Sequence, residues 1–201
     1  GTQVFQNNPC TGALVLTNLT KFGNSTFLAC PLLQELRFAG PIQTIGNVFN
    51  SCTAITNVEL ALPALTNLTA TFSGCTSLSN LTIGATNLMT VSSFSFNNSP
   101  LRSVTFWGPM PPAAALDNIL YNVADTTKSC DHACVIYASQ HQTGWKDYWL
   151  AHPVSDAETA TNKLPANCRG VYVTAANVRK AWIVEQESPY DGIRYFYIRV
   201  R

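Results

Sequence analysis

A short motif recurs through the first half of the chain and constrains its fold more than any other feature. Its clearest copy spans residues 72–83 and has the form F-x-x-C-x-x-L-x-x-L-x-I. Copies begin at Phe27, Phe49, Phe72 and Phe96, at intervals of 22, 23 and 24 residues by subtraction of their numbers. A period in the low twenties with paired leucines is typical of a leucine-rich solenoid. One unit cannot bury its apolar side alone, so the stack of units is what folds.

Each unit supplies a short strand and a further pair of apolar residues. The strands are expected near residues 14–16, 36–38, 58–60, 81–83 and 104–106. The apolar pairs precede the next phenylalanine and are Leu19 with Phe22, Ile42 with Ile45, Leu65 with Leu68, and Leu88 with Val91. Alternate strand residues point to opposite faces. We therefore predict a leucine-rich-repeat solenoid of about five units over residues 1–106, with stacked parallel strands and two inward apolar strips.

Three of the seven cysteines share one place in successive units. They are Cys30, Cys52 and Cys75, and Ser99 takes the same place in the fourth copy. Corresponding residues of stacked repeats lie about one strand spacing apart. The sequence therefore predicts a ladder of small buried side chains rather than a cysteine motif with its own chemistry.

Two other cysteines, Cys130 and Cys134, lie outside the repeats in the run Cys-Asp-His-Ala-Cys. A disulfide, two free thiols and a metal site are all compatible with this spacing. Zinc is the least favoured, because a zinc site usually needs a fourth ligand and a second matched pair.

The composition argues against charged partners. Asp, Glu, Lys and Arg make up 11% of the chain, and the formal net charge is +1. We therefore expect no nucleic-acid partner. No apolar run is long enough to cross a membrane. The sequence contains no nucleophile elbow, zinc-protease helix, phosphate loop, dinucleotide fingerprint or calcium loop, so we predict no catalytic residue, no metal and no cofactor.

The repeat pattern stops after Phe106. We interpret residues 107–152 as a C-terminal cap, opened by a proline-rich turn and a helical pattern over residues 113–124. Residues 153–164 are polar and read as a linker. Residues 165–201 contain strand patterns at 170–174, 181–187 and 192–200, for which short connections favour a small antiparallel extension. Its last strand reaches the end of the chain, so we expect a continuation beyond it.

The repeat resembles the BspA-type, or treponemal, leucine-rich repeat of bacterial and protist surface and secreted proteins. The resemblance rests on Phe72-Ser73-Gly74-Cys75, Phe49-Asn50-Ser51-Cys52 and Phe27-Leu28-Ala29-Cys30. The family commonly has Ala before the Phe, where this chain has Thr26, Val48, Thr71 and Ser95. Residues 134–137 and 143–148 also resemble the segment that closes such arrays, which implies that Trp145 and Tyr148 form cap core.

Two surfaces are candidate binding sites. The outward strand positions of the array are Val15, Arg37, Glu59, Thr82 and Thr105. They predict a flat, hydrogen-bonding face that suits a protein or glycan lying across several coils, although simple soluble strand positions would look the same. In the last strand, Tyr195, Tyr197 and Arg199 share one aromatic and basic face, which suits either ligand binding or packing against a neighbouring domain.

We interpret the chain as a non-enzymatic, monomeric protein of the cell surface or the extracellular space, whose signal sequence has been removed. The resemblance implies adhesion through a protein or glycan ligand. A competing hypothesis makes the array a scaffold within a surface assembly, with the C-terminal β extension as its attachment or binding module. A third and least favoured hypothesis is a hydrolase that uses His132 or His141 with a carboxylate in the cap.

Overall fold

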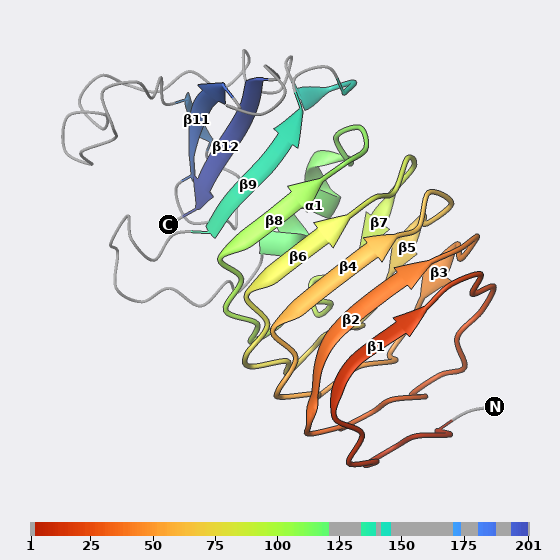
Figure 1. The fold of residues 1–201 in the computed structure, drawn as a ribbon. Helices are drawn as coiled ribbons and strands as arrows, with labels where there is room; N and C mark the ends of the chain where they lie inside the picture. Colours follow the sequence, from red (N-terminus) through yellow and green to blue (C-terminus); the bar gives the residue numbers. More distant parts are fainter. Residues whose placement is uncertain are drawn as a thin grey trace.

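The repeats form a stack of coils with one long parallel sheet along its side (Figure 1). The computed structural model describes residues 3–120, 134–139, 142–145, 171–173, 181–187 and 194–200. The array strands are β1 (Gly12–Leu16), β2 (Leu33–Ala39), β4 (Asn57–Ala61), β6 (Asn80–Ile83) and β8 (Ser103–Phe106). Neighbouring strands in this series pair in parallel. The five strands predicted from the repeats and the solenoid fold are thus confirmed.

A second, narrower sheet runs along another side of the coils. Its strands are β3 (Thr44–Ile45), β5 (Asn67–Leu68) and β7 (Thr90–Val91), which also pair in parallel. The apolar pairs of these three units are buried, and they are Ile42, Ile45, Leu65, Leu68, Leu88 and Val91. In the first unit, Leu19 and Phe22 are only partly buried against the core. The second inward strip is therefore present and is most complete in the middle of the array.

The phenylalanines of the motif stack on one another through the centre of the solenoid. The ring centroids of Phe27 and Phe49 are 5.3 Å apart, and those of Phe49 and Phe72 are 5.7 Å apart. Phe5 extends the stack at one end and Phe96 at the other. The ring planes are nearly parallel, at 9° for the first pair and 8° for the second, and stacked aromatic rings attract one another. The spacing of the motif along the chain thus brings the phenylalanine of each unit onto the phenylalanine of the preceding unit.

The cysteine ladder is confirmed, and each thiol has a hydrogen-bonding role. The thiol of Cys52 donates to the carbonyl oxygen of Phe27 at 2.9 Å, and that of Cys75 donates to Phe49 at 3.2 Å. Burial raises the pKa of Cys52 to about 11, so the thiol keeps its proton. The Ser99 hydroxyl makes the equivalent bond to the Phe72 carbonyl at 3.2 Å, which explains why Ser can replace Cys here.

The unusual residues before the phenylalanines are buried, and the polar ones are hydrogen-bonded. Thr71 Oγ1 donates to the Ile45 carbonyl oxygen at 3.0 Å, and Ser95 Oγ donates to that of Leu68 at 3.0 Å. A buried hydroxyl is costly only when it lacks a partner. These side chains therefore replace the usual Ala by binding the second sheet of the preceding unit.

The C-terminal end of the array is covered by helix α1 (Ala113–Leu120) and strand β9 (Cys134–Ser139). The apolar spacing in the sequence predicts that Ala113, Leu116 and Ile119 lie on the buried side of this helix. Leu116 and Ile119 are buried as predicted, but Ala113 is exposed and Ala115 is buried instead. Trp145 is fully buried, with its ring centroid 5.0 Å from that of Phe106. Its role as cap core is confirmed, whereas Tyr148 lies outside the described residues.

The remaining strands extend the main sheet. They are β10 (Val171–Val173), β11 (Ala181–Glu187) and β12 (Arg194–Val200), which pair antiparallel in that order. Strand β12 also pairs antiparallel with β9, and β9 pairs in parallel with β8. The predicted linker at 153–164 and Cys130, His132 and His141 lie outside the described residues. Within the described part of the chain, no helix is long and apolar enough to cross a membrane.

Candidate binding face

The outward positions predicted from the sequence lie side by side across the array strands. Strand register pairs each with the next, in the order Val15, Arg37, Glu59, Thr82 and Thr105. We call these five residues the central row. Val15 and Arg37 are exposed and the other three are half-buried. Because adjacent strands lie about 4.8 Å apart, the central row crosses roughly 19 Å of the sheet.

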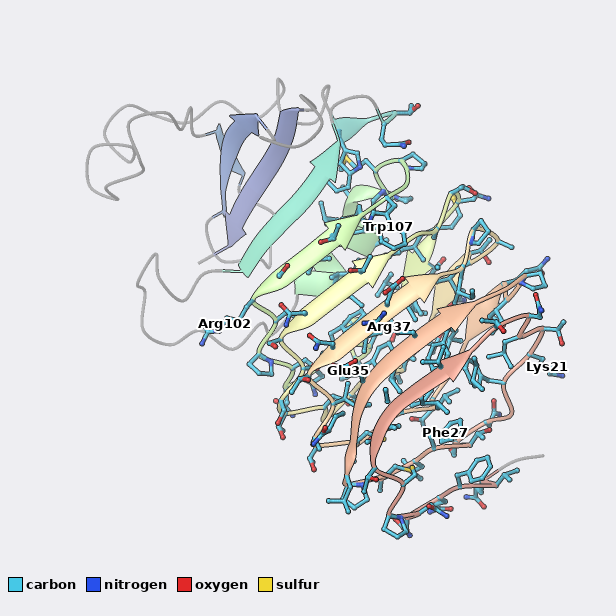
Figure 2. The ribbon with its side chains drawn as sticks, in the orientation of Figure 1. Lys21, Phe27, Glu35, Arg37, Arg102 and Trp107 are labelled. Carbon is cyan, nitrogen blue, oxygen red and sulfur yellow. The ribbon has the colours of Figure 1, made fainter. Side chains whose placement is uncertain are left out.

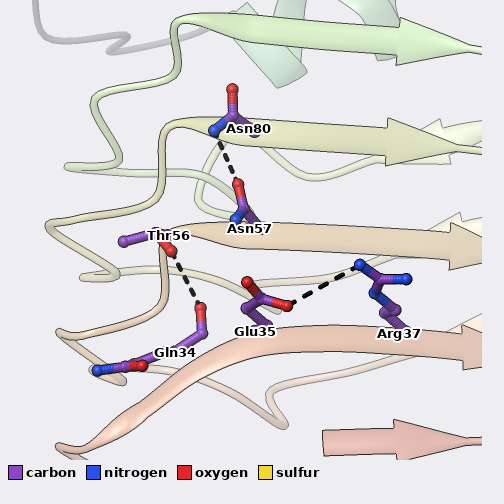
Figure 3. Close-up of polar contacts among 6 residues, drawn as sticks. All are labelled: Gln34, Glu35, Arg37, Thr56, Asn57 and Asn80. Carbon is purple, nitrogen blue, oxygen red and sulfur yellow. Dashed lines mark hydrogen bonds and ion pairs between the residues drawn. The ribbon is translucent and has the colours of Figure 1, made fainter. Parts of the chain in front are cut away.

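A second outward row lies two residues earlier on each strand, and we call it the amide row. It consists of Ala13, Glu35, Asn57, Asn80 and Ser103. The side-chain nitrogen of Asn80 donates to Asn57 Oδ1 at 2.7 Å (Figure 3). It also donates to Ser79 Oγ at 3.1 Å. These bonds hold the amides in fixed orientations, and the remaining oxygen of Asn80 and nitrogen of Asn57 can bind a ligand.

The charges on the face nearly balance. The five array strands carry Glu35, Arg37 and Glu59 as their only ionisable side chains. Arg37 Nη2 lies 4.0 Å from Glu35 Oε2, with both side chains well exposed to solvent (Figure 3). An exposed pair at this distance contributes little to stability. The pair is therefore free to exchange its internal contact for a ligand.

A third outward position contains a residue that the sequence reasoning missed. Trp107 follows β8 and is 52% exposed (Figure 2). Its backbone N–H donates to the Ile83 carbonyl oxygen at 3.0 Å, so the strand ladder continues past Phe106. The sequence interpretation assigned Trp107 to the exit turn. The alternation of Ser103, Thr105 and Trp107 against buried Val104 and Phe106 is the signal that could have found it.

The neighbours of Trp107 in this third row are small. Ala39 pairs with Ala61, and the Gly84 N–H donates to the Leu60 carbonyl oxygen at 2.8 Å, which places Gly84 beside Ala61. A Cβ atom on Gly84 would lie 3.1 Å from Trp107 Cε3. The indole therefore lies directly over the Gly84 backbone, and a strip of low relief continues from it across β4 and β2.

The tail residues named from the sequence belong to the same sheet by register. Tyr197 pairs with Tyr137, and Tyr137 pairs with Thr105, so the position of Tyr197 is in line with the central row. Tyr195 and Arg199 pair with Ser139 and Val135, respectively. The pairing thus brings the two candidate surfaces predicted from the sequence into one nine-stranded sheet.

The described outward rows offer hydrogen-bonding and charged side chains. Among the described residues, no group of three or more His, Cys, Asp or Glu side chains could hold a metal ion. The histidines of the hydrolase hypothesis, His132 and His141, fall outside this part of the chain.

A comparison with protein families now identifies the repeat. The model of the BspA-type leucine-rich repeat region matches residues 1–111 in six copies. The chain belongs to this family. Its solenoids are typically non-enzymatic, and its members are usually extracellular. No curated protein matches the chain, and no solved structure matches it either. The resemblance seen in the motif is confirmed, with one copy more than the approximate count from the sequence.

Proposed function

We propose that this BspA-type repeat protein is a non-enzymatic adhesion or binding protein that acts at the cell surface or after secretion. It presents the outward face of its main sheet to a protein or glycan. The array supplies a rigid support, because its strands are held in register by buried ladders on the opposite side.

The alignment of the central row is the observation that supports this proposal. Five side chains from five separate units stand in one line, although nothing in the core requires their identities. A flat face of this kind binds by adding many modest contacts over several coils. Arg37 and Glu59, which pair in register, supply the charged groups at its centre.

The proposal is tested by a pull-down of the full chain against panels of extracellular matrix proteins and immobilised glycans. The double variant Arg37→Ala/Glu59→Ala removes one positive and one negative charge, so the net charge is unchanged. We expect it to lose at least about tenfold in affinity for a captured ligand. Lys21→Ala is the control, because Lys21 is exposed and lies away from the array strands (Figure 2). Equal binding by the wild type and the double variant would refute the proposal.

A further inference from the structure

We infer that the ligand of this face is an uncharged saccharide chain, and that Trp107 is the platform on which one of its sugar rings stacks. The inference rests on the proposed function and narrows it to one class of ligand. It depends on the position of Trp107, on the relief around it and on the chemistry of the two polar rows.

Trp107 is an exposed aromatic residue on a rigid base. The backbone N–H of Trp107 donates to the Ile83 carbonyl oxygen, and the residue before it, Phe106, is buried. The residue after it, Gly108, packs so closely that an added Cβ would lie 1.9 Å from the Ala85 carbonyl oxygen. The backbone is thus fixed on both sides, while 52% of the Trp107 surface stays open to solvent. A large ring that is already ordered loses little entropy on binding.

The low surface around Trp107 suits a saccharide chain that lies across the strands. The indole covers Gly84, and Ala61 and Ala39 continue the third row beyond it with no bulky side chain. The central row runs alongside and ends at Thr105, two residues before Trp107. Three strand spacings separate β8 from β2, which is roughly 14 Å. A ligand of several rings can therefore contact Trp107 at one end and Arg37 at the other (Figure 2).

The charge of the face matches an uncharged ligand. Two carboxylates and one guanidinium stand on the five array strands, and the guanidinium already has Glu35 beside it. A polyanion would meet no excess of positive charge there. The remaining polar groups of the central and amide rows are hydroxyls and amides, which both donate and accept hydrogen bonds, as sugar hydroxyls do.

The distribution of apolar surface favours a saccharide over a protein. Protein interfaces usually have a central apolar core surrounded by a polar rim. Here the large exposed apolar side chains of the face are Val15 on β1 and Trp107 after β8, at opposite ends of the array strands. Polar side chains and small third-row residues lie between them. An aromatic face with its negative quadrupole instead attracts the C–H groups on one side of a sugar ring.

The experiment is calorimetric titration of the full chain with cellohexaose, maltohexaose and N-acetylchitohexaose, each compared with its disaccharide. We expect at least one hexaose to bind and to bind more tightly than its disaccharide. For that hexaose, Trp107→Ala should weaken binding at least about tenfold, whereas Trp107→Phe should retain most of the affinity. Phe94→Ala is the control, because Phe94 is 62% exposed but follows β7 of the second sheet.

Three results would overturn the inference. They are the absence of binding by all three hexaoses, equal affinity for hexaose and disaccharide, and unchanged hexaose affinity in a folded Trp107→Ala protein. Thermal melting of each variant shows that it is folded. Capture of a matrix protein that depends on Arg37 and Glu59, without any hexaose binding, would reject the saccharide and leave the proposed function intact. Insensitivity of all binding to Arg37→Ala/Glu59→Ala would reject the proposed function itself.

Discussion

Side chains inside and outside the coils share one register but differ in how closely they repeat. Inside, Phe27, Phe49 and Phe72 stack ring on ring, and Cys52 and Cys75 bind equivalent carbonyl groups. Outside, the central row contains a valine, an arginine, a glutamate and two threonines. An inward residue must fit its counterparts in the neighbouring coils, whereas an outward residue meets solvent or a ligand. Inward substitutions should therefore change stability, and outward ones should change binding.

The largest loss of stability is expected from breaking the phenylalanine stack. Phe72 is fully buried between Phe49 and Phe96. Phe72→Ala should lower the free energy of unfolding by about 3–5 kcal/mol, because it removes buried contacts and leaves a cavity. Urea denaturation measures the effect. The exposed Phe94→Ala should change it by less than about 0.5 kcal/mol, and similar losses at the two positions would contradict the comparison.

A smaller loss is expected where the chain leaves the array. A Cβ on Gly108 would meet the Ala85 carbonyl oxygen at 1.9 Å, so Gly108→Ala must push two backbone segments apart. We expect a loss of about 1–3 kcal/mol in urea denaturation. Gly46→Ala is the matched control, because its nearest contact would be Asn24 Oδ1 at 3.7 Å. A control that is destabilised as much as Gly108→Ala would refute this explanation.

Because its thiols are buried, the protein should have a lower free energy of unfolding in alkali. Burial raises the pKa of Cys52 from an ordinary value of 9.0 to about 11. Above pH 9.0 the unfolded state releases this proton while the folded state keeps it. The stabilising contribution of the protonated thiol is therefore fully present below pH 9.0 and should be lost as the pH rises from 9.0 to about 11. The free energy of unfolding of Cys52→Ser, measured by urea titration, should fall less steeply with pH over this range than that of the wild type. Parallel profiles for the two proteins would mean that the thiol is not protected.

The smallest effect on stability is expected for the outward ion pair. Arg37 Nη2 and Glu35 Oε2 are 4.0 Å apart, and both side chains are exposed to solvent. Glu35→Gln should therefore change the free energy of unfolding by less than about 1 kcal/mol. The same urea titration, repeated at high salt, checks this. A larger loss would show that the outward face also contributes to folding.

The inward side of the molecule could be predicted from the sequence because it repeats. The positions of Phe49, Cys52 and Cys75 follow from their spacing alone, and so do the strands that contain Val58 and Leu81. The hydroxyl partners of Thr71 and Ser95 could not be predicted, since their acceptors belong to the preceding unit and nothing local indicates them.

The outward side was predictable in position but not in detail. Alternation placed Arg37 and Glu59 on the face, and register confirms that they are neighbours. The bond between Asn57 and Asn80 requires side-chain orientations that no pattern carries. Trp107 was missed because the periodic motif ends at Phe106, while hydrogen bonding along the strand continues for one more outward residue.

The central claim is that the outward side chains bind the ligand, whereas the inward side chains stabilise the fold. The most direct test measures ligand affinity and melting temperature together for the wild type and Arg37→Ala/Glu59→Ala. We predict an affinity at least about tenfold lower. The melting temperature should shift by only about 1–4 °C, since exposed charges contribute little to stability. Unchanged affinity, or an affinity loss that appears only with a large fall in melting temperature, would contradict the account.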